Sequence, residues 1–165
     1  MTVLTHLHQS VIQFLELPEK IRISRILAPR WVGYPQALTI LSKLEELKAY
    51  PRSHRMPNLL IAGSTNNGKT MLVKRFCQKY EPDDNIDGEE AIVPVLYVQA
   101  PPVPDEGRFY SNILTLLFAP HRHSDRVEKK QFQVLTLLRR VGVQILVIDE
   151  IHHILAGNLN KQRIF

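Results

Sequence analysis

Apolar residues recur along the chain with two different periods, which predict two kinds of element. Spacings of three and four predict helices, most of them ended by a proline or glycine, over residues 4–17, 19–28, 36–49, 68–80, 106–119 and 125–141. Short apolar, β-branched runs predict buried strands at residues 58–62, 93–100 and 143–148. Gly142 is expected to cap the last helix. Strands that alternate with helices predict a parallel α/β sheet flanked by helices.

Composition restricts the class of protein. The 165 residues, 44% of them hydrophobic, are enough for one domain with its own core. The only cysteine, Cys77, excludes an internal disulfide and suits a reducing compartment. No apolar run is as long as a membrane span, and the N-terminus lacks a signal-peptide pattern. A cytoplasmic protein that does not associate with membranes is therefore expected.

Residues 63–70 have the sequence Gly-Ser-Thr-Asn-Asn-Gly-Lys-Thr and lie between the predicted strand 58–62 and the predicted helix 68–80. Strand, Gly-x-x-x-x-Gly-Lys-Thr and helix together form the phosphate-binding loop, or P-loop. Gly63 and Gly68 are expected to adopt dihedrals that a Cβ disfavours, so that successive N–H groups turn toward one anion. The positive end of the following helix dipole adds to the attraction.

The end of this motif supplies a charge and a metal ligand. Lys69 is predicted to contact the β- and γ-phosphates of ATP, and the Thr70 hydroxyl to ligate Mg²⁺. The residues predicted to bind the nucleotide in this loop are Gly63, Ser64, Thr65, Asn66, Asn67, Gly68, Lys69, Thr70 and Met71.

A pair of carboxylates, Asp149 and Glu150, directly follows the predicted strand 143–148. The carboxyl ends of strands in open α/β sheets face the ligand crevice, so Asp149 is predicted to hold Mg²⁺. Glu150 is predicted to orient and polarise the attacking water, with Lys69 as the second catalytic residue. An adjacent Asp-Glu pair favours a hydrolysing ATPase over a small P-loop kinase.

Four stretches of the sequence then resemble one family. They are RWVGYPQAL (30–38), MPNLLIAGSTNNGKT (56–70), VLYVQAPPVPDEGRFY (95–110) and IDEIHHILAG (148–157). From about residue 22 onward the chain resembles the TniB-type AAA+ ATPases of bacterial transposons, relatives of the TnsC and phage Mu B regulators. The resemblance implies ATP binding and hydrolysis, self-assembly into a ring or filament on double-stranded DNA without sequence preference, and recruitment of a DDE transposase.

The resemblance also implies a domain division and further site residues. Residues 1–57 would form a helical N-terminal arm with the start of the AAA+ module, and residues 58–165 the N-terminal part of the nucleotide-binding domain. Tyr34 or Val32 would contact adenine; the alternative is that Trp31 and Tyr34 anchor the arm.

A sensor residue, an arginine finger and a helical lid are features of the family that we do not find in the sequence. We therefore expect an incomplete AAA+ fold and a C-terminally truncated chain with little or no ATPase activity. By resemblance, a further strand belongs between residues 58–62 and 143–148. Its absence would leave a slot of about 10 Å, or the two segments would pair directly and move Asp149 toward Thr70.

Charge suggests two places for DNA contacts. Residues 1–60 hold 8 Lys/Arg and 4 acids, and residues 61–165 hold 13 and 12, so most of the net charge of +5 is N-terminal, near Arg22, Arg25 and Arg30. By resemblance the contacts come from residues 105–130, where a basic cluster consists of Arg122, Arg126, Lys129 and Lys130. On charge alone, a solvated helix face is the preferred explanation of either cluster. The acidic stretch 81–90 should face away from DNA.

Two histidine pairs, His121-x-His123 and His152-His153, lack the helical i, i+4 spacing of a zinc site, so the sequence favours no metal role for them. His152 or His153 could instead relay the nucleotide state from Glu150. Three functions therefore remain open: an AAA+ transposition ATPase, another small P-loop enzyme, and a remnant that binds nucleotide or a partner without turnover.

Overall fold

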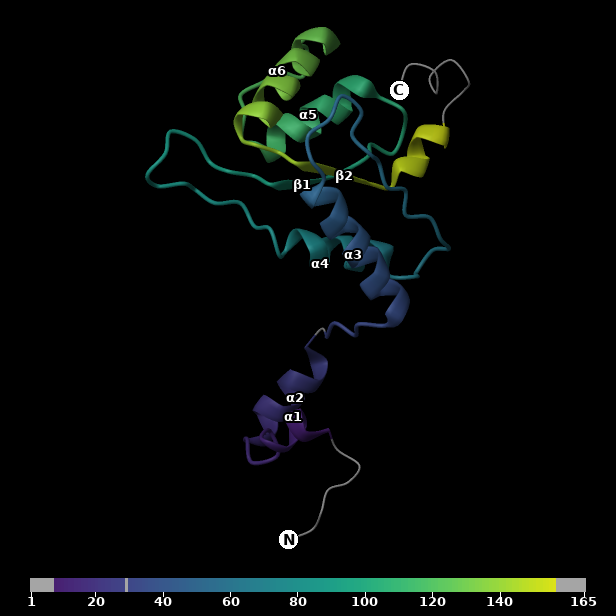
Figure 1. Cartoon of the computed structure of the whole chain (residues 1–165), viewed down its shortest axis with the longest axis vertical. Coiled ribbons are helices and arrows are strands. Elements are labelled where there is room, and N and C mark those ends of the chain that lie inside the picture. The colour runs from purple at the N-terminus through teal and green to yellow at the C-terminus, as the bar shows by residue number, and fades with distance from the viewer. Residues whose placement is uncertain (1–7, 29, 157–165) are drawn as a thin grey trace. The chain divides into compact units, whose positions relative to one another are not determined.

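The computed structural model describes residues 8–28 and 30–156 and divides the chain into two units, residues 1–35 and 36–165 (Figure 1). The first unit contains the short helix α1 (Gln9–Ile12) and α2 (Glu19–Leu27). In the described part of the predicted helix 4–17, only α1 is helical; residues 13–17 form turns and a bend. Pro18 separates the two helices and takes an extended conformation at the start of α2.

The second unit contains the elements that carry the site (Figure 1). They are α3 (Pro35–Ala49), which begins at the boundary, α4 (Lys69–Cys77), β1 (Val95–Gln99), α5 (Glu106–Leu116), α6 (Val127–Arg140), β2 (Ile145–Asp149) and the 3₁₀ helix η1 (Ile151–Ala156). The predicted helices 19–28, 36–49, 68–80, 106–119 and 125–141 are therefore confirmed within a few residues at each end, as are the predicted strands 93–100 and 143–148.

The two strands pair in parallel, with Val95 opposite Ile145 and Gln99 opposite Asp149. Alternate side chains of a strand point to opposite faces of the sheet. Leu96 and Val98 of β1 join a buried apolar cluster with residues of α5 and α6. Figure 1 shows α5 and α6 on one side of the strands and α4 on the other. The intervening residue Tyr97 therefore faces α4, whose N-terminus follows the predicted phosphate loop.

The core lies between the sheet and the α5–α6 pair. Its buried side chains are apolar and come from β1, α5, α6 and the segment just before β1: Val93, Leu96, Val98, Phe109, Ile113, Leu114 and Val134. Burial of this apolar area contributes most of the stabilisation, at roughly 25 cal/mol per Å². The opposite face of β1 packs on Leu72, Val73 and Phe76, the buried face of α4.

The predicted strand at residues 58–62 is wrong. These residues are irregular, and Leu60 is 77% exposed. Among the described residues the sheet holds β1 and β2 alone, so nothing pairs with the backbone of 58–62. Neither predicted arrangement, an empty slot between two strands or direct pairing of 58–62 with 143–148, is found in this part of the chain. An apolar run supplies the propensity for a strand, but a strand also requires a neighbouring backbone to bond.

The predicted cap at Gly142 is confirmed. Gly142 has φ +70°, the left-handed conformation that glycine adopts without steric cost. Its N–H donates to the Arg139 carbonyl at 3.3 Å, and the Val143 N–H donates to the Leu138 carbonyl at 2.9 Å. This pair of bonds is a Schellman motif. It ends α6 and turns the chain directly into the approach to β2.

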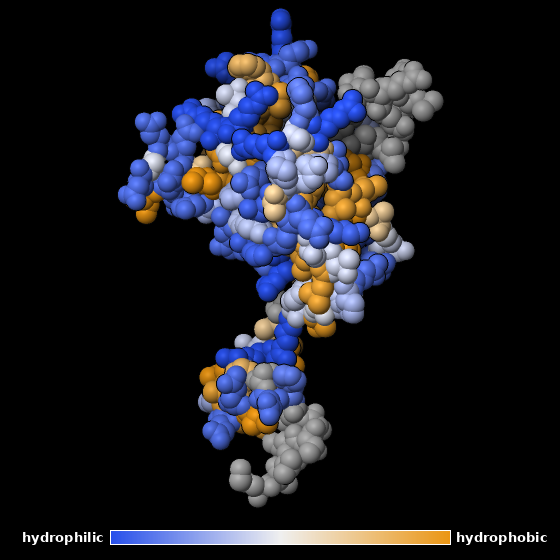
Figure 2. Space-filling model, in the orientation of Figure 1, coloured by the Kyte–Doolittle hydropathy of each residue, from blue (hydrophilic) through white to orange (hydrophobic). Residues whose placement is uncertain are grey.

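The acidic loop 81–90 protrudes between α4 and β1 (left side of Figure 1) and is predominantly hydrophilic in Figure 2. An antiparallel bridge between Asp83 and Ile92 closes it, with bonds of 2.9 and 2.8 Å. Glu90 forms an ion pair with Arg140 at the end of α6. Part of the negative charge is therefore balanced within the unit. No helix of the described residues has the length and apolar composition to cross a membrane.

Candidate functional site

The predicted phosphate loop runs directly into α4. Gly68 precedes the helix with φ 72° and ψ 13°, and its carbonyl accepts the first helical bond from Leu72 at 2.9 Å. Asn66 is also left-handed, with φ 62°. Left-handed residues alternating with right-handed or extended ones turn successive N–H groups toward one side of a loop. The backbone geometry thus depends on glycine at Gly68, where a residue with a Cβ would be strained.

Gly63 behaves differently, and the expectation of a glycine-only dihedral there is wrong. Its φ lies outside the left-handed region, and a Cβ added to it would meet Asn67 and Lys69 at ordinary contact distances of 3.9 Å. The turn places its left-handed residues later, at Asn66 and Gly68. The first glycine of the motif is therefore not required by the backbone conformation of this structure.

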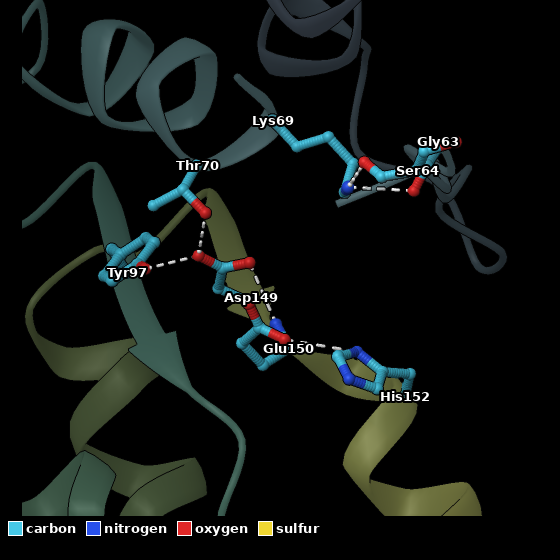
Figure 3. Close-up of polar contacts among 8 residues, drawn as sticks. All are labelled: Gly63, Ser64, Lys69, Thr70, Tyr97, Asp149, Glu150 and His152. Atoms are coloured by element: carbon cyan, nitrogen blue, oxygen red, sulfur yellow. Dashed lines mark hydrogen bonds and ion pairs between the residues drawn. The ribbon is translucent and has the colours of Figure 1, made fainter. Parts of the chain in front are cut away.

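Lys69 folds back over the loop that precedes it (Figure 3). Its ammonium donates to the carbonyls of Gly63 at 2.9 Å and Ser64 at 2.7 Å. The side chain points away from Asp149 and toward the mouth of the loop. The loop residues 63–68 are exposed, so this cation lies at a solvent-accessible backbone turn. Such an arrangement can exchange two carbonyl acceptors for the oxygens of an anion.

Thr70 and Asp149 meet across the site although 79 positions separate them (Figure 3). The Thr70 hydroxyl, in the first turn of α4, donates to Asp149 Oδ2 at 2.9 Å. Asp149 is the last residue of β2, where strand geometry places it beside the start of α4. The structure therefore brings the two predicted Mg²⁺ ligands together, and it does so without any pairing between residues 58–62 and β2.

Tyr97 is a third member of this group, and the sequence analysis missed it. Its hydroxyl donates to the same Asp149 oxygen at 2.6 Å. Gln99 lies opposite Asp149 in the register, so Tyr97 lies on the same face of the sheet, two residues earlier on the neighbouring strand. The available signal was a tyrosine within an otherwise apolar strand, on the face away from Leu96 and Val98.

The surroundings of Asp149 favour its charged form. Burial raises the pKa of its carboxyl, but the hydrogen bonds from Tyr97, from Thr70 and from the Glu150 N–H, with the nearby charge of Lys74, outweigh burial and lower it. Burial and the bond to Asp149 raise the pKa of the Tyr97 hydroxyl. The site therefore presents a carboxylate with two hydroxyl donors, a set of hard oxygen ligands.

Glu150 breaks the regular strand geometry directly after Asp149. Its φ of 57° is left-handed, which is uncommon for a residue with a Cβ. Its N–H donates to Asp149 Oδ1 at 2.9 Å, while its carboxylate Oε2 lies 3.2 Å from Nδ1 of His152. Figure 3 shows the Glu150 side chain directed toward His152. Strained backbone of this kind is concentrated at functional sites.

The contacts of this group shown in Figure 3 do not involve the other predicted site residues. Met71 is 57% exposed on α4. Tyr34 and Val32 belong to the first unit and are 44% and 74% exposed. A role of either in holding adenine stays a prediction.

The predicted basic cluster at the start of α6 is smaller in the structure than in the sequence. Lys130 is buried, 3% exposed, and its ammonium donates to the His123 carbonyl at 2.9 Å. Lys129 forms an ion pair with Asp125 at 2.8 Å. These two cations therefore serve the local fold. Arg122 and Arg126 are exposed, and they are the members of the cluster that a polyanion can reach.

Comparison with known families decides the identity of the chain. A family model described as "Bacterial TniB protein" matches residues 22–165. The chain belongs to the TniB family. The TniB match includes the predicted phosphate loop, Tyr97, Asp149 and Glu150. A search of curated proteins returned no match. Membership in the TniB family makes this a transposition-associated protein and confirms the resemblance seen in the sequence.

Proposed function

We propose that this TniB-family chain is a P-loop ATPase of the AAA+ type that binds ATP with Mg²⁺ and regulates DNA transposition. The observation that carries the proposal is the contact between Thr70 and Asp149 at 2.9 Å. This contact supports the proposal because it joins two residues that are far apart in the sequence, and one of them directly follows the predicted phosphate loop.

Phosphate binding follows from the N-terminus of α4. Backbone N–H groups around Gly68 and the helix dipole favour an anion at this position. Lys69 supplies a full positive charge at the same loop, where its ammonium bonds the carbonyls of Gly63 and Ser64. On binding ATP, we expect the ammonium to exchange these carbonyls for β- and γ-phosphate oxygens, which are stronger acceptors because they are charged.

Thr70 and Asp149 fit Mg²⁺ because the ion prefers oxygen ligands and is often held by one hydroxyl, one carboxylate and phosphate oxygens. Their oxygens lie 2.9 Å apart and have the correct chemistry. When bound, the ion neutralises charge on the phosphates. Tyr97 would hold the Asp149 carboxylate in place from the neighbouring strand β1.

Glu150 is the residue we propose to orient and polarise the attacking water, adjacent to the Mg²⁺ carboxylate. Its carboxylate is 38% exposed and lies beside His152, so it must leave that histidine to act on a water. His152 would thereby hold the resting position of the catalytic carboxylate. This arrangement is one way in which nucleotide or DNA binding could switch turnover on.

In the proposed function the ATP-bound chain assembles into a ring or filament on double-stranded DNA and recruits a DDE transposase. Contacts to the phosphate backbone would dominate the DNA affinity, which explains a lack of sequence preference. The exposed Arg126 supports such contacts. The proposal draws its partners from the TniB family, whose members are associated with transposition.

A second function, nucleotide binding without turnover, is favoured by the pairing of Glu150 with His152. If that pairing persists with ATP bound, the carboxylate does not orient the attacking water. ATP turnover by the purified chain, measured with and without duplex DNA, separates the two functions. If the chain is an ATPase, duplex DNA should stimulate its turnover, and Glu150→Gln should abolish turnover while ATP binding is kept. Equal, negligible turnover in the unchanged chain and in Glu150→Gln would leave only the binding function.

A further inference from the structure

A second group of metal-binding side chains follows β2, next to the proposed nucleotide site. Glu150, His152 and His153 each offer one ligand atom, and these atoms lie within 4.8 Å of one another. Glu150 Oε2 and His152 Nδ1 are 3.2 Å apart, and the two imidazole rings have centroids 4.5 Å apart. The three side chains converge because of a local backbone feature rather than by the helical i, i+4 spacing that the sequence lacks.

That backbone feature is the start of η1. The left-handed φ of 57° at Glu150 turns the chain out of the strand. The His153 N–H then donates to the Glu150 carbonyl at 3.0 Å, which closes a 3₁₀ turn. A 3₁₀ helix has three residues per turn, so residues i and i+3 lie one above the other. Glu150 and His153 are therefore on one side of the turn, with His152 beside them.

His153 gives an independent indication of an absent ligand. Its Nδ1 atom is buried and has no hydrogen-bond partner among the described residues. Buried polar atoms are nearly always satisfied, and an exception calls for an explanation such as a water or an ion. The His152 and Glu150 side chains are 68% and 38% exposed, so an ion can enter from solvent.

The chemistry of the three ligands selects the ion. Two imidazoles and one carboxylate suit Zn²⁺ and similar divalent transition metals, whereas Mg²⁺ prefers oxygen alone. Zinc ligands lie about 2.0–2.2 Å from the ion, so all three atoms must come within about 4 Å of one another. Rotation of the exposed His152 ring and the Glu150 side chain can supply this small adjustment.

We propose that Glu150, His152 and His153 form a site for one divalent transition-metal ion such as Zn²⁺, distinct from the Mg²⁺ site at Thr70 and Asp149. Three protein ligands leave a fourth position for water. The ion would hold the Glu150 carboxylate and so inhibit ATP turnover. That consequence rests on the proposed function, but the metal site itself does not.

Isothermal titration calorimetry tests the site: the untagged, nucleotide-free protein is titrated with Zn²⁺ alone. We expect one ion per chain, with the affinity lowered about tenfold or more by His152→Ala and by His153→Ala. His123→Ala, in the other histidine pair, is the matched control and should keep the affinity of the unchanged chain. Circular dichroism checks that each variant is folded. If His153→Ala does not fold, the result for His152→Ala decides the test, because His152 is exposed.

Two controls separate this site from the nucleotide site. Excess Mg²⁺ should leave the Zn²⁺ bound, and Lys69→Ala should bind Zn²⁺ normally even though its ATP binding is weakened. Absence of Zn²⁺ binding, binding that survives both His152→Ala and His153→Ala, or displacement of the ion by Mg²⁺ would each overturn the proposal. None of these results depends on whether the chain hydrolyses ATP.

Discussion

Tyr97 and Asp149 lie diagonally across the parallel strands β1 and β2, and the tyrosine hydroxyl donates a 2.6 Å hydrogen bond to Asp149 Oδ2. The same oxygen accepts the bond from Thr70 on α4. The sheet register and the start of α4 together fix the position of one carboxylate. In the proposed site this carboxylate is a ligand of Mg²⁺, so its position should determine how well the ion binds.

The substitution Tyr97→Phe removes the tyrosine hydroxyl that bonds Asp149 and changes the side-chain volume little. Partners that orient a metal ligand typically contribute 10- to 100-fold to metal affinity. We therefore expect the Mg²⁺ concentration needed for half-maximal ATP binding to rise about tenfold. Tyr110→Phe is the matched control, because the Tyr110 hydroxyl bonds Glu106 within α5, away from the site. Identical Mg²⁺ titrations for the two variants would remove Tyr97 from the site.

The two glycines of the phosphate loop should respond differently to alanine. Gly68 has φ +72°, which costs a residue with a Cβ about 1–2 kcal/mol, so Gly68→Ala should lower stability and ATP affinity. Gly63→Ala requires no such dihedral and places its methyl group at 3.9 Å from its neighbours. Thermal unfolding should show a loss for Gly68→Ala that Gly63→Ala does not share. Equal losses would contradict the loop geometry.

Local sequence signals predicted much of this fold correctly. The end of α6 at Gly142 depends on the conformation of a few neighbouring residues. The same holds for the break at Pro18 before α2 and for the helix that begins after Gly68. The Asp-Glu pair after an apolar run also predicted where Asp149 would lie. In each case the residues that determine the feature are close together in the sequence.

Features that depend on distant contacts were missed. Residues 58–62 have the composition of a strand but no strand beside them in the described chain. The bond from Tyr97 depends on the register between β1 and β2, which the pattern of apolar residues does not specify. Lys130 looked like part of a basic surface, but the packing of α6 buries it. Charge counts cannot distinguish a buried lysine from an exposed one.

The contact between α3 and the turn that follows α4 predicts how the stability of the fold depends on pH. Hydrogen bonds from Lys79 and Tyr80 lower the pKa of Glu45 despite its partial burial, and the distance from Lys79 Nζ to the carboxylate is 2.6 Å. A carboxyl whose pKa is lower in the folded state stabilises the fold above its unfolded pKa, and this stabilisation is lost as pH falls through the folded value.

Glu45→Gln should therefore lower the melting temperature at pH 7 by a few degrees at most, since the pair is exposed. The difference from the unchanged chain should shrink as the pH falls below about 4. Glu46→Gln is the control, because the Glu46 carboxylate accepts a hydrogen bond from Ser42 of the same helix, α3. A difference that stays constant from pH 7 to pH 3 would show that the charge of Glu45 is not responsible.

DNA binding should require ATP and should weaken steeply with salt, because phosphate contacts release counterions. Arg126→Glu should reduce the affinity of the ATP-bound protein several-fold at low salt and lower the salt dependence. Arg139→Glu, an equal charge reversal near the other end of α6, is the control. Lys130 is a poor test of the same idea, because reversing a buried charge disrupts the fold. Fluorescence anisotropy with a labelled duplex would show the idea to be wrong if both arginine variants bound equally.

The central claim is that residues 63–70 bind the phosphates of ATP, and calorimetric titration with ATP and Mg²⁺ tests it most directly. Lys69→Ala removes the loop cation, a charged hydrogen-bond donor, and should weaken ATP binding by about 10- to 100-fold or more. Arg75→Ala removes an exposed cation farther along α4 and should leave the affinity unchanged within about twofold. Equal ATP affinity for Lys69→Ala, Arg75→Ala and the unchanged chain would contradict the assignment of the nucleotide site.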